Sequence, residues 1–161
     1  MPQGVVKPSN QIVAYGDPLA VEMEIGANAT AAKMLPGRVV IFDDVDQTVK
    51  ESGAKAVSIA GFLEVAPAKK KTDAYAVGDQ AKVVFGECLA VLTLLANENV
   101  TRGDKLVTAA DGKLAKQATG AMGEQGSVVA EAWESSNVAS DVEILCIGSL
   151  ALNLLLRALE S

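Results

Sequence analysis

The sequence contains no histidine among its 161 residues. Histidine is the side chain most often used for acid–base catalysis near neutral pH and for binding transition metals. For nucleophilic catalysis, Cys88 and Cys146 have no neighbour in sequence that would stabilise a thiolate. We therefore predict no catalytic residues and a protein that is not an enzyme.

Basic residues are also scarce. Lysine and arginine number 14 against 20 acidic residues, which gives a formal net charge of −6. Phosphate binding requires clustered lysine and arginine, and the only tight run, at 69–71, lies beside Pro67 and is interpreted as a solvated loop. The charge therefore disfavours a nucleic-acid partner.

Long apolar runs are missing as well. The most apolar stretch, 144–159, is interrupted by Asn153 and Arg157 and is shorter than the roughly 20 residues of a membrane helix. The N-terminus lacks the basic region and apolar stretch of a secretory signal peptide. We expect neither a membrane span nor secretion, so Cys88 and Cys146, each in an apolar run, are predicted to be buried free thiols.

Carboxylates are the remaining candidates for metal ligands, and Asp43, Asp44 and Asp46 form a dense group. An EF-hand loop beginning at Asp44 requires glycine at its sixth position and glutamate at its twelfth, where this sequence has Val49 and Lys55. The group is interpreted as an acidic turn between strands. The glycines at every third position from 120 to 126 match neither a phosphate loop nor a dinucleotide fingerprint, so no metal or cofactor site is predicted.

Half of the residues are hydrophobic and 21% are charged, which is the composition of a folded domain. From residue 17 onward, short apolar runs are separated by Gly, Asp and Asn, a pattern typical of strands bounded by turns. The predicted strands are 19–24, 38–42, 58–65, 80–85, 88–95, 105–108, 127–133 and 142–147. A helical turn is predicted at 27–35. The predicted fold is mainly β, a small antiparallel β-barrel or tulip-like domain over residues 17–148.

Two segments flank this domain. Residues 1–16 hold Pro2, Gly4 and Pro8 among apolar residues, which predicts an extended N-terminal arm. Residues 149–161 are rich in leucine and are predicted to pack on the domain or at a subunit interface. One helical face of this tail would carry Leu152, Leu155, Leu156 and Leu159, whereas alternation of Leu150, Leu152, Leu154 and Leu156 also suits a strand. A helix is favoured.

A weak internal repetition runs through the domain. The dipeptides Gly37-Arg38, Gly78-Asp79 and Gly103-Asp104 each precede a predicted strand, because glycine permits positive φ and aspartate bonds to backbone amides in turns. The first and third units then continue alike, into 59–64 and 129–134. Asp111-Gly112 predicts a hairpin. This repetition predicts a β-meander or a small β-barrel with two loosely similar halves.

The order of features over 100–116, 127–133 and 141–144 resembles the small capsid decoration or cement proteins of tailed viruses. These share a glycine–aspartate turn, a strand, an Asp-Gly hairpin, a strand ending in a small or acidic residue, and a last short strand. The resemblance covers residues 37–148, without a counterpart for the tail. It implies a structural protein, often a trimer, that binds the major capsid protein on the outer surface of the virion after synthesis in the host cytoplasm, and stabilises the shell by bridging capsomers.

Two sets of residues are candidates for these contacts. An arm that orders on the shell can add a strand to an exposed capsid edge, with side chains from Val5, Val6, Ile12 and Val13. The candidate oligomer interface is Leu152, Leu155, Leu156 and Leu159, because an exposed apolar patch usually marks an interface. Alternative hypotheses are a ring-forming β-barrel of a phage tail or microcompartment shell, and a small-molecule-binding β-barrel.

Overall fold

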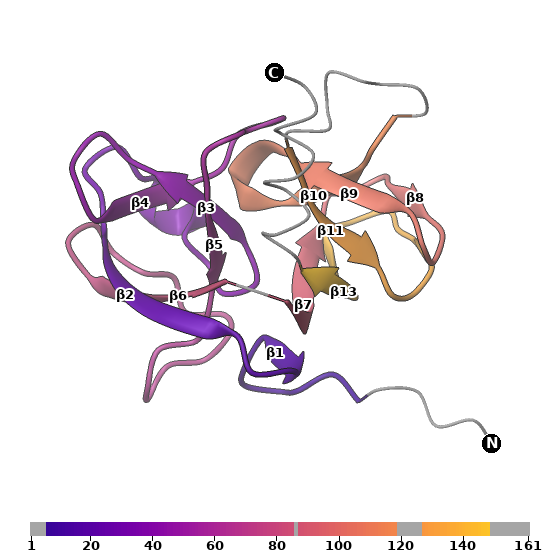
Figure 1. Ribbon diagram of the computed structural model, residues 1–161, viewed down its shortest axis with the longest axis horizontal. Coiled ribbons are helices and arrows are strands. Elements are labelled where there is room, and N and C mark those ends of the chain that lie inside the picture. Colours follow the sequence, from indigo (N-terminus) through magenta and orange to yellow (C-terminus); the bar gives the residue numbers. More distant parts are fainter. Residues whose placement is uncertain (1–5, 86, 119–126, 149–161) are drawn as a thin grey trace.

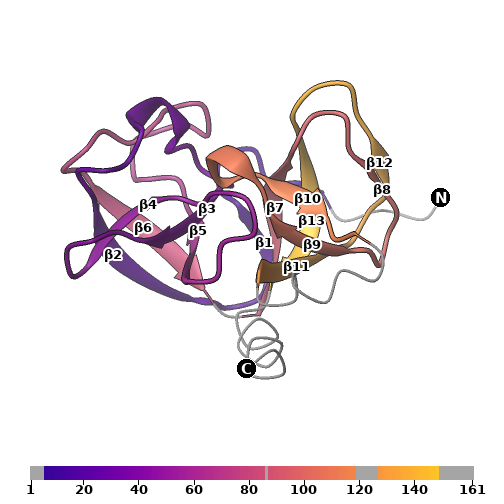
Figure 2. The same cartoon turned by 90° about the horizontal axis from the view of Figure 1, so that it is seen from above.

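Two small β-barrels lie side by side in the computed structural model, which describes residues 6–85, 87–118 and 127–148 (Figure 1, Figure 2). The first barrel has the closed order β2-β4-β3-β5-β6 and the second the order β7-β10-β9-β11-β13, closed by pairing of β13 with β7. The strands of the first are β2 (Leu19–Ile25), β3 (Val39–Phe42), β4 (Thr48–Glu51), β5 (Ile59–Leu63) and β6 (Gln80–Phe85). Those of the second are β7 (Cys88–Leu94), β9 (Lys105–Thr108), β10 (Leu114–Lys116), β11 (Val128–Ala132) and β13 (Val142–Gly148). The predicted mainly β, barrel-like fold is confirmed, with two barrels in place of one.

Short elements complete the fold. Strand β1 (Val13–Tyr15) pairs with β7, and β8 (Asn99–Val100) pairs with β12 (Ser136–Asn137). The helical turn predicted at 27–35 is a single 3-10 turn, η1 (Ala31–Lys33). Among the described residues, no helix is long and apolar enough to cross a membrane.

The two barrels have the same strand topology. In the first, β2 pairs antiparallel with β6 and touches β4 in parallel only at its end; in the second, β7 has the same relation to β13 and β10. The β3–β4 hairpin corresponds to β9–β10, and β5 corresponds to β11. In the first barrel, Ile25 of β2 lies opposite Val49 of β4. In the second barrel, Leu94 of β7 lies opposite Leu114 of β10, so Ile25 and Leu94 are equivalent positions. The repetition in the sequence reflects this repeated topology.

The turns before β6 and β9 follow the chemistry expected of Gly-Asp. Gly78 and Gly103 have φ angles of 87° and 94°, which side chains disfavour. The carboxylate of Asp79 accepts a hydrogen bond from the Ala76 N–H at 2.9 Å, and Asp104 accepts one from the Thr101 N–H at 2.8 Å. Each turn therefore carries its own local hydrogen bond.

The predicted hairpin at Asp111-Gly112 joins β9 to β10 through a short turn, η2 (Ala110–Gly112). Asp111 and Gly112 both have positive φ angles, 60° and 73°. Positive φ at both central residues is the backbone geometry that makes this dipeptide a strong hairpin former. This local prediction is confirmed.

A shared apolar core joins the barrels. Side chains of Val39, Phe62 and Val84 from the first barrel belong to the same buried cluster as Leu92 and Cys146 from the second. Backbone bonds also cross between the barrels: the Thr93 N–H donates to Gly37 O at 3.1 Å and the Gly112 N–H donates to Ser52 O at 2.9 Å. Because these contacts are buried and hydrogen-bonded, the barrels form one structural unit.

Candidate interaction surfaces

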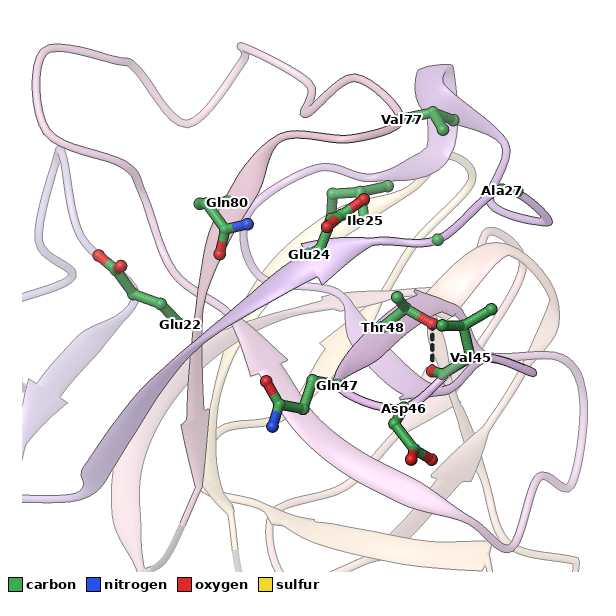
Figure 3. Close-up of a pocket in the computed structure, with 11 residues that line it drawn as sticks. Glu22, Glu24, Ile25, Ala27, Val45, Asp46, Gln47, Thr48, Val77 and Gln80 are labelled. Atoms are coloured by element: carbon green, nitrogen blue, oxygen red, sulfur yellow. Dashed lines mark hydrogen bonds between the residues drawn. The ribbon is translucent and has the colours of Figure 1, made fainter.

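An acidic groove of about 310 Å³ lies over the outer side of β2 (Figure 3). Glu22 and Glu24 project from β2, Gln80 from β6, and Asp46 and Gln47 from the turn that precedes β4. Among the described residues that line this β2 groove, every charged side chain is a carboxylate. The groove can therefore bind cationic side chains or donors of hydrogen bonds.

Asp43, one of the acids considered as a metal ligand, serves the protein itself. Its carboxylate accepts hydrogen bonds from the backbone N–H and the side-chain amide of Asn28, at 3.1 and 2.8 Å, and pairs with Lys50 at 3.3 Å. Burial alone would raise the pKa of Asp43, but these hydrogen bonds outweigh it and lower the pKa to about 2. Gly26 lies so close that a Cβ there would collide with this carboxylate. Asp43 thus holds the turn that follows β2.

No group of three or more Cys, Asp or Glu side chains is placed to hold a metal ion in the described part of the chain. The acids Asp43, Asp44 and Asp46 lie in the turn between β3 and β4, as the sequence predicted. The side-chain amide of Asn28 also donates to Asp44, at 3.0 Å. The cluster is a structural turn.

A second buried carboxylate, Glu64, anchors the N-terminal segment. Glu64 Oε1 accepts hydrogen bonds from the Ile12 N–H at 2.7 Å and the Val65 N–H at 2.8 Å, and Oε2 accepts one from Val13 at 3.4 Å. The Val91 N–H donates to Ile12 O at 2.8 Å, which continues the pairing of β1 with β7. Residues 12–15 therefore belong to the double barrel.

Cys88 and Cys146 are free thiols in the apolar core, as predicted. Burial raises the pKa of Cys88 to about 11 and raises that of Cys146 as well. A thiol with a raised pKa stays protonated at neutral pH and is a poor nucleophile. Both residues contribute to packing.

The comparison with protein families decides what this double barrel belongs to. A family model described as XM1 gp53 minor capsid protein matches residues 10–149. The chain belongs to this family. No curated protein matches the sequence.

The matched range of this minor capsid protein coincides with the folded part described above, from just before Ile12 to just after Gly148. The crystal structure of the head fiber gp8.5 N base in bacteriophage phi29 is similar, with a TM-score of 0.50 and 15% sequence identity. The similarity covers 83% of this chain and 95% of that chain, and it concerns the fold. Family membership supports a structural role in a phage virion and points to a non-enzymatic protein.

The four residues predicted to grip the shell differ in accessibility. Val5 lies outside the described residues, Val6 is 85% exposed, and Val13 is partly buried in β1. Ile12 is 1% exposed and belongs to the shared apolar core. The side chain of Ile12 is therefore out of reach of any partner in this conformation, because β1 ties it to β7 and Glu64 holds its backbone. Strand β1 (Val13–Tyr15) and the buried Ile12 thus lie within the predicted arm, residues 1–16, and the described residues ahead of them, 6–11, are exposed or partly buried.

The four tail leucines Leu152, Leu155, Leu156 and Leu159 lie outside the described residues, so their role at an oligomer interface stays a prediction. Strand β13 ends at Gly148, where a Cβ would approach Phe62 of the first barrel to 2.5 Å. The tail therefore follows a residue at the junction of the two barrels.

Sequence reasoning missed β2 as an exposed surface. The apolar run bounded by turn residues predicted a strand at 19–24 without indicating which of its side chains are exposed. In the structure, Leu19 and Val21 are exposed although they lie in a strand. Local sequence carries no sign of this, because exposure here depends on which strand lies beside β2.

Proposed function

We propose that this minor capsid protein is a decoration subunit that binds the major capsid protein on the outer surface of the shell and stabilises it by bridging neighbouring capsomers. The family match over residues 10–149 is the observation that carries the proposal. The double barrel with its common core supports it as a rigid scaffold between contact points. A subunit that binds only the assembled shell stabilises that state by mass action.

The N-terminal segment that carries Val5 and Val6 is the proposed shell contact. Its base lies against both barrels. Lys7 pairs with Glu134 of the second barrel and donates to Glu143 O at 2.8 Å, and Lys71, from the loop between β5 and β6 of the first barrel, donates to Pro8 O at 2.8 Å. These contacts fix where the segment leaves the barrel and leave Val6 accessible. An apolar segment of this kind can order on the shell and add a strand to an exposed edge.

A trimer held by the tail leucines Leu152, Leu155, Leu156 and Leu159 completes the proposal. Binding restricts the freedom of a segment's backbone and side chains and so costs free energy, which means that one segment alone binds weakly. Three segments engaging neighbouring sites raise the effective concentration and the overall affinity. Analytical ultracentrifugation of a chain ending at Gly148 tests this. The mass should fall from that of a trimer to that of a monomer, and an unchanged mass would show that the tail does not hold the subunits together.

Co-sedimentation with expanded empty shells tests the function. The full chain should pellet with the shells and raise their thermal disruption temperature. Deletion of residues 2–6 should leave the unfolding temperature unchanged and weaken attachment about tenfold or more, a loss of ~1.4 kcal/mol or more in the overall free energy of binding. A Gln3→Ser variant is the matched control and should attach normally. Failure of the full chain to attach, or formation of rings or tubes without shells, would contradict the proposal.

A further inference from the structure

Strand β2 has an unpaired edge in the part of the chain that the structure describes. β2 runs along the outer surface of the first barrel (Figure 1) and pairs with β6 from Leu19, opposite Phe85, to Glu24, opposite Gln80. On its other side it meets β4 only at Glu24 and Ile25. Residues 19–23 therefore have a partner strand on one side only.

The direction of the backbone bonds shows which groups face this edge. The Glu24 N–H donates to Gln47 O at 3.1 Å and the Gly26 N–H donates to Val49 O at 2.9 Å, both on the side of β4. Backbone N–H groups alternate in direction along a strand, so those of Ala20 and Glu22 point to the same side. No described residue pairs with β2 on that side at positions 19–23, so both groups are available to a further strand.

The second barrel shows what the equivalent edge binds. There β7 pairs with β10 only at Leu94, and β1 covers the first part of the edge, with Val13 opposite Ala90 and Tyr15 opposite Leu89. Between these two partners, the Thr93 N–H donates to Gly37 O at 3.1 Å. The equivalent inward-facing residues differ in burial accordingly: Cys88 and Ala90 are 5% and 0% exposed. Their counterparts Leu19 and Val21 are 67% and 40% exposed. Within residues 6–85, 87–118 and 127–148, the first barrel therefore has no counterpart of the strand that completes the second.

The charge around the open edge of β2 indicates which kind of polypeptide can bind there. The β2 groove presents Glu22, Glu24 and Asp46, while the chain as a whole carries a net charge of −6, so a second copy would bring mostly like charge. The chain's own residues 7 and 8 are bonded to the second barrel and to Lys71. A different polypeptide with basic side chains fits better than either.

We infer that the open edge of β2 accepts an extended, basic segment of the shell protein as an added strand. Main-chain bonds form to Ala20 and Glu22, apolar side chains of the segment cover Leu19 and Val21, and lysine or arginine on its other face reaches Glu22, Glu24 and Asp46. The inference rests on the proposed function, and it identifies the edge of β2 as a part of this protein that contacts the shell protein. It is independent of the N-terminal segment, whose deletion leaves β2 intact.

Amide hydrogen exchange of the full chain, free and bound to expanded empty shells, tests the inference. The amides of Ala20 and Glu22 should exchange fast in the free protein and slow at least tenfold on the shell. Attachment without protection at residues 19–23 would overturn the inference and leave the proposed function intact, whereas no attachment would overturn both. Concentration-dependent protection in the free protein would assign the edge to a second copy. Protection lost on truncation after Gly148 would assign it to the tail; either result overturns the inference.

Substitutions give a second, independent test. Glu22→Pro removes an N–H that faces away from β6, a placement that edge strands tolerate, and should weaken shell attachment at least tenfold. Glu22→Ala removes the carboxylate and keeps the N–H, so it separates the backbone bond from the charge and should weaken attachment less. The pair Glu22→Lys and Glu24→Lys should also weaken it, while Asp73→Lys, an exposed change of the same sign elsewhere, should not. Normal attachment of both the proline and the double-lysine variants, with unchanged unfolding temperature, would contradict the inference.

Discussion

At the scale of single residues, two carboxylates hold the backbone of neighbouring segments. Glu64 accepts hydrogen bonds from three backbone N–H groups in the core. Asp43, beside the β2 groove, accepts hydrogen bonds from the backbone N–H and the side-chain amide of Asn28. Neither role is visible in the sequence, because the donors lie 15 or more residues away in most of these bonds. Each carboxylate joins segments that would otherwise separate.

Asp43→Asn should change how stability depends on pH. The folded-state pKa of Asp43, about 2, lies below the ordinary value of 3.8, so the stability it adds is present above pH ~4 and is lost as pH falls toward 2. The variant lacks this contribution and should be less stable at pH 7, with the two proteins converging at low pH. Urea unfolding from pH 7 to pH 2 measures this.

Asp46→Asn provides the control for this prediction, since Asp46 is an exposed carboxylate in the same turn. Its urea midpoint at pH 7 should match that of the unmodified protein. Equal behaviour of the two variants would show that general charge, and not the bonds to Asn28, sets the acid sensitivity.

At the scale of elements, β1 is the strand whose placement matters most for the interaction surface. It is only three residues long, yet it covers the edge of β7 and brings Ile12 into the core. Proline and glycine nearby suggested an arm, because they weaken local structure. Contacts to β7 and Glu64, which are distant in sequence, override that local tendency.

Deletion of residues 2–13 should therefore destabilise the fold, whereas deletion of residues 2–6 should not. The longer deletion removes the buried Ile12 and leaves Glu64 without two of its backbone donors, at a cost of about 3 kcal/mol or more. The shorter deletion removes residues ahead of Lys7 and its ion pair. Thermal unfolding of both variants measures the difference, and equal unfolding temperatures would show that β1 is not part of the stable fold.

At the scale of the whole molecule, the two barrels should unfold together. Phe62 is completely buried between them, against Gly148 of the second barrel. Phe62→Ala should lower the free energy of unfolding by about 3–5 kcal/mol because it leaves a cavity in the shared core. Near-UV circular dichroism of Trp133, in the second barrel, should report the same transition as far-UV circular dichroism.

Phe42→Ala is the matched control, because Phe42 lies in β3 of the same barrel but is exposed. This variant should unfold within about 1 kcal/mol of the unmodified protein. If Phe62→Ala instead left the Trp133 transition unchanged, the barrels would be independent units and the shared core would contribute little.

The sequence by itself determined the local features of this protein. All eight predicted strands are present within two residues at either end, as are the Gly-Asp turns, the Asp111-Gly112 hairpin and the two buried thiols. These depend on alternation, on positive φ and on apolar surroundings, which neighbouring residues specify. Strands β4 and β10 were missed because three or four residues with charged members resemble loops until a partner strand defines them.

Only the tertiary structure decided how these elements combine. It decided that one predicted barrel is two of equal topology and that β1 belongs to the second. It also decided that residues 19–23 of β2 pair with β6 alone in the described part of the chain. The physical reason is that strand pairing is a contact between segments far apart in the chain. Residues 19 and 21 of β2 are exposed while the equivalent residues of β7 are buried, because β1 lies beside β7 and, among the described residues, no strand takes that place beside β2.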